Sequence, residues 1–177
     1  ILLPYLILKE NAAVRKSIQN RFKVIMVDEY QDSNVAQFKL LKALSGVEEN
    51  SGTYVCVVGD DDQSIYKFRG ATIENILNFE DEYRNATTIR LEQNYRSTSV
   101  ILDAANAVIK NNTKQKEKNL WTEKEGGEKI TLYTAPDDFA EAKFVSEKIL
   151  DSVKNGSKFS ENAILYRMNA QSRNLEN

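Results

Sequence analysis

The chain has 177 residues, of which 41% are hydrophobic and 28% are charged, and this composition excludes a disordered or membrane-embedded protein. Its formal net charge of −2 gives no overall attraction to nucleic acid, so any binding of nucleic acid must use a local patch. The absence of histidine excludes histidine-based triads, general bases and metal ligands. The single cysteine excludes a disulfide framework and is typical of a protein of the reducing cytoplasm.

The first residues predict a helix rather than a membrane span. Residues 1–8 are mostly apolar, but the run is too short to cross a bilayer and no basic segment precedes it. We expect a helix or helix end that packs in a core, with helical structure over residues 5–20, and no membrane partner. The chain begins without methionine and stops at Asn177, just inside what looks like a new helix. We therefore expect it to be a piece of a longer protein.

The stretch from Lys23 to Asp32 is an apolar run that ends in two adjacent carboxylates, Asp28 and Glu29. Its four consecutive apolar residues, 24–27, predict a strand buried on both faces, as in a parallel sheet. Open α/β sheets place ligand crevices at the carboxyl edge, where paired acids can hold Mg²⁺ and activate water. An isolated Asp-Glu pair can equally be an acidic turn that closes a strand.

Strands and helices alternate along the chain, which predicts parallel βαβ units and an α/β fold. The expected strands cover residues 24–27, 54–58, 87–91, 130–133 and 163–166. The further expected helices cover residues 35–44, 73–82, 100–109 and 138–155, with N-caps at Ser33 or Asn34, Ser97 or Thr98, and Asp137 or Asp138. The lysine-rich stretch 110–129 is interpreted as a solvated loop.

Three segments carry a resemblance to a known family. They are residues 27–32 (Val-Asp-Glu-Tyr-Gln-Asp), 59–71 (Gly-Asp-Asp-Asp-Gln-Ser-Ile-Tyr-Lys-Phe-Arg-Gly-Ala) and 91–97 (Leu-Glu-Gln-Asn-Tyr-Arg-Ser). In this order and spacing they resemble motifs II, III and IV of the UvrD/Rep/PcrA family of superfamily 1 DNA helicases. Residues 164–173 resemble a further motif of that family, and the similarity covers nearly the whole chain from about Arg21 onward.

The resemblance implies two motor units with the parallel-sheet, RecA-like α/β fold of P-loop NTPases. A composition shift near residues 91–95 places the boundary, so residues 1–91 would be the C-terminal part of the first unit. Residues 92–177 would be the N-terminal part of the second. Both units are expected to be incomplete, because the sequence contains no G-x-x-x-x-G-K-[ST] loop and lacks the family's late motifs.

The resemblance also assigns roles around ATP and Mg²⁺. Asp28 would coordinate the Mg²⁺ of Mg-ATP, and Glu29 would orient and activate the hydrolytic water. Gln63 would sense the γ-phosphate through its amide, although glutamine in a turn can be purely structural. Tyr95 would stack on the adenine. Arg96 would reach the γ-phosphate as an arginine finger, which stabilises charge in the transition state.

The DNA side of the same resemblance involves aromatic and basic residues. Tyr66, Phe68 and Arg69 would stack unpaired bases and grip a phosphate; as an alternative, the two aromatics are core residues. The family usually has tryptophan where Phe68 stands, and phenylalanine offers a smaller ring. Arg167 and Asn169 would bind a DNA phosphate at a helix start, or serve as a simple helix cap.

The expected function is therefore ATP-dependent movement on single-stranded DNA and unwinding of duplex DNA, in DNA repair or replication. The other partner would be the remainder of the parent helicase chain, without which this piece would be inactive. Two alternatives remain. One is a metal-dependent nuclease that uses Asp28, Glu29, Asp60 and Asp61 to hold two metals, although we expect residues 60–62 to shape their loop by hydrogen bonds. The other is a non-catalytic nucleic-acid-binding module.

Overall fold

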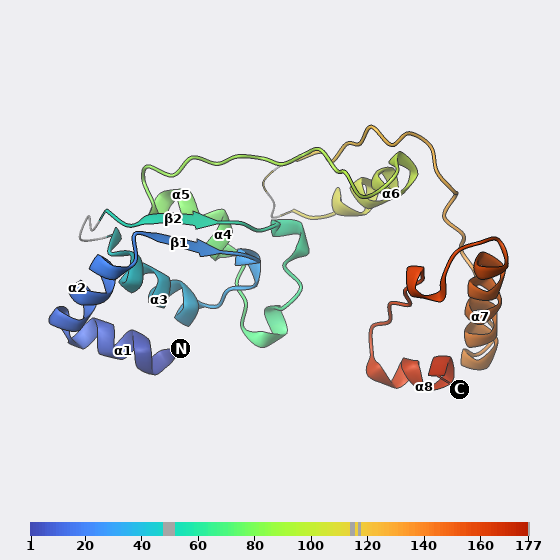
Figure 1. Ribbon diagram of the computed structural model, residues 1–177, viewed down its shortest axis with the longest axis horizontal. Helices are drawn as coiled ribbons and strands as arrows, with labels where there is room; N and C mark the ends of the chain where they lie inside the picture. Colours follow the sequence, from blue (N-terminus) through green and yellow to red (C-terminus); the bar gives the residue numbers. More distant parts are fainter. Residues whose placement is uncertain (48–51, 114–115, 117, 177) are drawn as a thin grey trace. The chain divides into compact units, whose positions relative to one another are not determined.

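The computed structural model describes residues 1–47, 52–113, 116 and 118–176. The chain divides into two compact units, Ile1–Glu128 and Lys129–Asn177. In the described part of the first unit, the longer elements are α1 (Leu2–Glu10), α2 (Ala12–Arg21), β1 (Val24–Val27), α3 (Val35–Ser45), β2 (Tyr54–Val57), α4 (Glu74–Leu77), α5 (Phe79–Glu82) and α6 (Ser99–Ile109). The second unit contains α7 (Asp138–Lys154) and α8 (Ser172–Glu176). The elements follow one another from blue to red in Figure 1.

Strands β1 and β2 pair in parallel, with Val24 opposite Tyr54 and Val27 opposite Val57. Helix α3 joins them, because parallel neighbours need a crossover connection. The fold is thus α/β with a parallel sheet, as predicted, and the described residues form a sheet of two strands. The prediction that β1 is buried on both faces is wrong: Val24 and Met26 are exposed. Exposure alternates along this strand because only one of its faces is covered.

Helices α1, α2 and α3 pack together beside the sheet (Figure 1). Leu8 and Leu41 are buried, and the side-chain amide of the buried Gln19 donates to the Ala43 carbonyl at 3.0 Å. The predicted helix at the start of the chain is confirmed, but Asn11, in an extended conformation, divides it into α1 and α2. At the far end of α3, Gly46 adopts φ = 59°, a left-handed conformation that glycine permits and that ends the helix.

Three predicted strands are wrong: residues 87–91, 130–133 and 163–166 form no strand. Their apolar side chains, such as Ile89, are exposed. A β-strand exists only when a neighbour accepts and donates its backbone hydrogen bonds, and the described residues provide no such neighbour for these segments. The predicted helix 73–82 is present as the two short helices α4 and α5, with Asn78 between them.

The predicted helices around α6 and α7 are confirmed. Thr98 is the N-cap of α6, and the carboxylate of Asp137 caps α7 by accepting a hydrogen bond from the Ala140 N–H at 2.7 Å. Within the second unit, the Asn174 side chain of α8 donates to Asp138 at 2.5 Å. None of the helices in the described part of the chain has the length and apolar character needed to span a membrane.

Candidate active site

The two loops that follow β1 and β2 lie side by side at the carboxyl end of the sheet. Backbone pairing continues past the strands, since the Val58 N–H donates to the Val27 carbonyl at 2.8 Å and the Tyr30 N–H donates to the Val58 carbonyl at 2.9 Å. Asp28 and Glu29 follow β1, while Gly59 and the next three acids follow β2. Carboxylates from two strands are thereby gathered at the edge where α/β sheets bind ligands.

Glu29 has an unusual backbone conformation, with φ = 49° and ψ = 43°. It is the only non-glycine residue with positive φ among those that the structure describes. A left-handed residue that is not glycine costs energy and persists where its surroundings hold it. Here the Glu29 N–H donates to Asp28 Oδ1 at 2.9 Å, and both side chains are exposed to solvent. The turn therefore presents two adjacent carboxylates outward at the end of β1.

Gln31 connects this turn to the loop after β2. Its side chain, 1% exposed, donates from Nε2 to Glu29 Oε2 at 2.7 Å, while its Oε1 accepts from the Asp60 N–H at 3.0 Å. A side chain at Gly59 would collide with this amide, because a Cβ there would lie 2.6 Å from Gln31 Oε1. Gln31 was missed as a functional residue in the sequence, where it is one letter of motif II.

The Gln63 side chain is held by its own loop. Its Nε2 donates to Asp60 Oδ2 at 2.6 Å, and Asp60 Oδ1 accepts from the Asp62 N–H at 3.1 Å, which closes the 3₁₀ turn over Asp61–Gln63. Asp60 therefore shapes the loop by hydrogen bonds, as predicted. An amide NH₂ group has two donor hydrogens, so Gln63 can donate to a ligand as well as to Asp60.

Lys118 lies among the three acids of this loop. Its Nζ is 2.5 Å from Asp60 Oδ1, 2.7 Å from Asp61 Oδ1 and 3.0 Å from Asp62 Oδ2. Burial by itself would raise the pKa of Asp60, but hydrogen bonds from Lys118 and Gln63 lower it below its usual value. Burial would lower the pKa of Lys118, and its hydrogen bonds to the acids raise it instead. The Asp60 carboxylate and the Lys118 ammonium therefore stabilise each other in their charged forms.

The three carboxylates of Asp60, Asp61 and Asp62 are close enough together to suggest a metal site. The ammonium of Lys118 already contacts an oxygen of each of the three carboxylates, so a lysine stands where a metal ion would bind. The interpretation of residues 110–129 as only a solvated loop is wrong at Lys116 and Lys118. Lys118 was missed because its partners lie far away in the sequence, and lysine-rich stretches are usually solvated.

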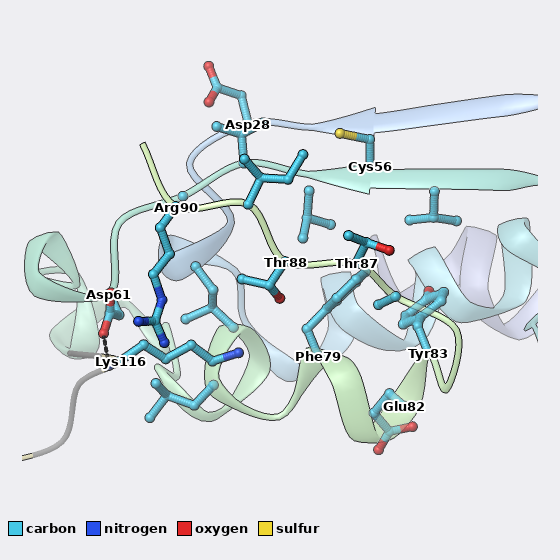
Figure 2. Close-up of a pocket in the computed structure, with 18 of the residues that line it drawn as sticks. Asp28, Cys56, Asp61, Phe79, Glu82, Tyr83, Thr87, Thr88, Arg90 and Lys116 are labelled. Atoms are coloured by element: carbon cyan, nitrogen blue, oxygen red, sulfur yellow. Dashed lines mark hydrogen bonds between the residues drawn. The ribbon is translucent and has the colours of Figure 1, made fainter. Parts of the chain in front are cut away.

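A groove with a volume of about 1600 Å³ runs along β2 and the ends of both loops. Asp28, Glu29, Gln63 and Lys118 line it, together with the extended segment 84–92 on the other side. Figure 2 shows the Thr88 and Arg90 side chains reaching from that segment into the groove. The structure therefore brings three of the predicted site residues to one cavity: Asp28, Glu29 and Gln63.

Tyr95 and Arg96 lie on a turn before α6 and do not line this groove. The Asn94 side chain shapes the turn, because its Oδ1 accepts from the N–H groups of Arg96 at 2.9 Å and Ser97 at 2.7 Å. Tyr95 donates to Gln93 Oε1 at 2.7 Å, and both the tyrosine ring and the Arg96 side chain are exposed. They remain available to a ligand, and their predicted roles stay predictions.

Tyr66, Phe68 and Arg69 form a compact exposed cluster. The two rings are 5.9 Å apart between centroids, and the Arg69 guanidinium carbon lies 5.2 Å from the Tyr66 centroid and 5.5 Å from the Phe68 centroid. Tyr66 is 37% exposed and Phe68 is 70% exposed, so the alternative that they are core residues is wrong. An exposed ring beside a guanidinium is suited to stacking on a base and contacting a phosphate.

Arg167 and Asn169 belong to the second unit. Gln171 caps this segment, since its Oε1 accepts from the Arg167 N–H at 3.0 Å and from the Met168 N–H at 2.8 Å. Both predicted side chains are exposed, and Asn169 begins a 3₁₀ turn that leads into the short α8. The helix start is capped from within, so any DNA contact here would use the side chains themselves.

Two protein-family models match this chain. The family model described as UvrD/REP helicase N-terminal domain matches residues 1–84, and the one described as UvrD-like helicase C-terminal domain matches residues 89–177. The chain therefore belongs to the UvrD/Rep helicase family, whose domains have RecA-like α/β folds.

Individual relatives in this family share more than half of their aligned residues with the chain. Over 158 residues it is 56% identical to the ATP-dependent DNA helicase PcrA of Staphylococcus aureus (strain NCTC 8325 / PS 47). The identity to the PcrA of Staphylococcus epidermidis (strain ATCC 12228 / FDA PCI 1200) is also 56% over 158 residues. Each match covers 89% of this chain and 21% of the relative, so the chain spans about a fifth of the length of these relatives.

Proposed function

We propose that this chain forms part of an ATP-dependent DNA helicase, which couples ATP hydrolysis to movement along single-stranded DNA and to separation of duplex DNA. The observation that carries the proposal is one groove lined by the carboxylates of Asp28 and Glu29 and the amide of Gln63. The family and the names of the relatives support it. We further propose a role in DNA repair or replication, and a cytoplasmic location in keeping with the single cysteine.

Asp28 fits the role of Mg²⁺ ligand. Its carboxylate is exposed, and its Oδ1 accepts from the Glu29 N–H, which restrains its orientation. Mg²⁺ prefers oxygen ligands of this kind, and in enzymes it is bound by one or two carboxylates together with substrate phosphates. When bound, the ion neutralises charge on the phosphates during phosphoryl transfer.

Glu29 and Gln63 supply positioning, which is most of what phosphoryl transfer requires from a protein. The Glu29 carboxylate accepts a proton from, and orients, the attacking water, while the turn geometry and Gln31 fix its direction. The second amide hydrogen of Gln63 donates to the γ-phosphate. Tyr95 stacks on the adenine, and the Arg96 guanidinium stabilises negative charge on the transferred phosphoryl group.

We propose that the rest of a longer helicase chain supplies the phosphate-binding loop, which this sequence does not contain. In this proposal residues 1–91 belong to the first motor unit and residues 92–177 to the second. The chain on its own then hydrolyses ATP negligibly, because one side of the nucleotide is not held.

On the DNA side, Phe68 and Tyr66 stack on unpaired bases while Arg69 contacts a phosphate. The exposed rings and the guanidinium beside both of them support this role. Arg167 and Asn169 provide a second contact to the DNA backbone. Stacking tolerates any base, as a motor that moves along a strand requires.

The contacts of Lys118 disfavour a two-metal nuclease. Asp60 and Asp61 would have to release the partly buried ammonium of Lys118 before they could hold a metal ion. A purely binding module is disfavoured because it does not explain why Glu29 is held in a strained, left-handed conformation. Strain of this kind is typically found at functional sites.

Strand separation by the full-length protein that contains this chain distinguishes the three functions. The substrate is a duplex with a single-stranded tail and a labelled strand, incubated with Mg²⁺ and either ATP or ADP. We expect intact single strands with ATP and none with ADP. Shortened strands without ATP would establish the nuclease, and DNA binding without strand separation or ATP hydrolysis would establish the binding module.

A further inference from the structure

We propose that Lys118 is a positioning residue for ATP hydrolysis, which holds the loop that carries Gln63 by binding Asp60. The inference rests on the proposed function, in that Gln63 is taken to contact the γ-phosphate. It adds a residue outside the helicase motifs and assigns it a structural task. Although Lys118 lines the same groove, its ammonium is bound to the three aspartates of the loop, so we assign it the task of holding that loop.

The Lys118 ammonium is bound by several carboxylates of one loop at the same time. A single ammonium lies within 3.0 Å of oxygens from three consecutive aspartates, and its side chain is 18% exposed. A lysine ammonium has three donor hydrogens, so each carboxylate can receive one. Hydrogen bonds between charged groups are the strong ones, particularly where water is partly excluded.

Two neighbours of Lys118 in the sequence reinforce the same contact. The Lys116 N–H donates to Asp61 Oδ2 at 2.6 Å, and the Asn112 side-chain amide donates to Asp62 Oδ1 at 3.1 Å. Three donors from the segment after α6 thus meet the three acids of the loop after β2. This segment follows the turn that carries Arg96, so the contact ties it to the loop that carries Gln63.

Asp60 transmits the effect of Lys118 in two directions. Its Oδ2 accepts from Gln63 Nε2 at 2.6 Å, and its N–H donates to Gln31 Oε1, whose amide donates to Glu29. Without the ammonium, three adjacent carboxylates would repel one another in a partly buried place. The loop would then open, and the Gln63 amide would lose its fixed acceptor.

The experiment compares full-length wild type with three variants. Lys118→Met removes the charge and keeps the length of the side chain, whereas Lys118→Arg restores the charge. Lys116→Met is the matched control, because its ammonium pairs with Glu80 at 2.9 Å and not with the loop acids. Two quantities are measured: hydrogen exchange of a peptide covering residues 59–65, and the kcat and KM of ATP hydrolysis with single-stranded DNA.

We expect Lys118→Met to speed exchange in the peptide about tenfold and to lower kcat about tenfold with little change in KM, since it removes a charged hydrogen bond. Lys118→Arg should restore most of the slow exchange and most of kcat, whereas Lys116→Met should change neither quantity. Exchange in α3 should stay unchanged in all three variants. Unchanged exchange and kcat in Lys118→Met would overturn the inference and leave the helicase function standing. Faster exchange in Lys118→Met than in wild type, together with a wild type that has no ATPase activity, would support the role of Lys118 in holding the loop. That result would overturn the proposed function instead.

Discussion

The side-chain amide of Gln31 donates a 2.7 Å hydrogen bond to Glu29 Oε2. The same amide accepts from the Asp60 N–H, and it is 1% exposed, so water cannot replace either bond. One buried side chain therefore joins the proposed catalytic carboxylate after β1 to the loop after β2. Any rotation of Glu29 away from its position would leave a buried donor without a partner, which is costly.

Replacing Gln31 with methionine should slow ATP hydrolysis while sparing nucleotide binding. The change keeps the volume but removes both hydrogen bonds, so Glu29 loses its orientation. We expect kcat of the full-length protein to fall about tenfold or more, with KM for ATP nearly unchanged. Gln37→Met is the control, because the Gln37 side chain accepts from the Asn34 N–H to cap α3. An equal kcat for Gln31→Met and wild type would contradict the positioning role.

Tyr30→Phe should leave the protein as stable as wild type or stabilise it. Burial raises the pKa of Tyr30, and its hydroxyl has no hydrogen-bond partner among the described residues. Its ring packs edge-on against the Phe79 ring, with 5.7 Å between the ring centroids, and phenylalanine keeps this contact. Tyr83→Phe is the matched comparison, because that hydroxyl shares a 3.3 Å hydrogen bond with Ser45.

We expect the Tyr83→Phe protein to lose about 0.5–1.5 kcal/mol of stability, the usual net contribution of one hydrogen bond. Thermal unfolding of the two full-length variants beside wild type measures the difference. A larger loss for Tyr30→Phe than for Tyr83→Phe would show that the Tyr30 hydroxyl has an important partner.

Phe68 should contribute to the affinity for single-stranded DNA through its exposed face. Phe68→Ala is expected to weaken binding by about 1–3 kcal/mol, the range for one stacked base, and Phe68→Trp to strengthen it. Fluorescence anisotropy with a labelled oligonucleotide measures both. Phe139→Ala is the control, since that ring is 73% exposed but lies on α7. Identical affinities for Phe68→Ala and Phe139→Ala would exclude stacking at Phe68.

The stability contributed by Asp60 should depend on pH in a defined direction. Burial opposes ionisation, but hydrogen bonds from Lys118 and Gln63 prevail, so the folded pKa lies below the usual 3.8. A lowered folded pKa means that the ionised group stabilises the fold above pH 3.8 and that this stability is lost as the pH falls through the folded pKa. The full-length Asp60→Asn variant should therefore unfold at a lower temperature than wild type at neutral pH. The difference between the two unfolding temperatures should shrink in acid. A difference that is constant with pH would refute the ionic contact.

Local patterns in the sequence were enough to predict much of this fold. The apolar run before Asp28 predicted β1, and the helical periods predicted α6 and α7, because these signals depend on neighbours within a few residues. The strand predicted at 87–91 is absent because strand formation requires a hydrogen-bonded neighbour, which sequence periodicity cannot supply. The burial of β1 on one face alone has a similar cause, since it depends on what covers the sheet.

In the candidate site, too, features that depend on nearby residues could be predicted, and features that depend on distant contacts could not. Asp28, Glu29 and Gln63 could be found because each lies in a recognisable motif, and the structure brings them to one groove. The tasks of Gln31 and Lys118 could not be predicted, since they consist of contacts across 29 and 58 residues of sequence. Such contacts depend on the folded arrangement of the two loops, which no local pattern records.

The most direct test of the account is the Mg²⁺-dependent ATPase activity of the full-length protein, with and without single-stranded DNA, in wild type and Glu29→Gln. We expect DNA to stimulate the wild type. The variant should bind nucleotide as well as wild type but hydrolyse it at least about a hundredfold more slowly, since general-base catalysis typically contributes that much or more. Equal hydrolysis rates for the two proteins, or activity that ignores DNA, would contradict the assignment of a DNA-driven motor with Glu29 as its base.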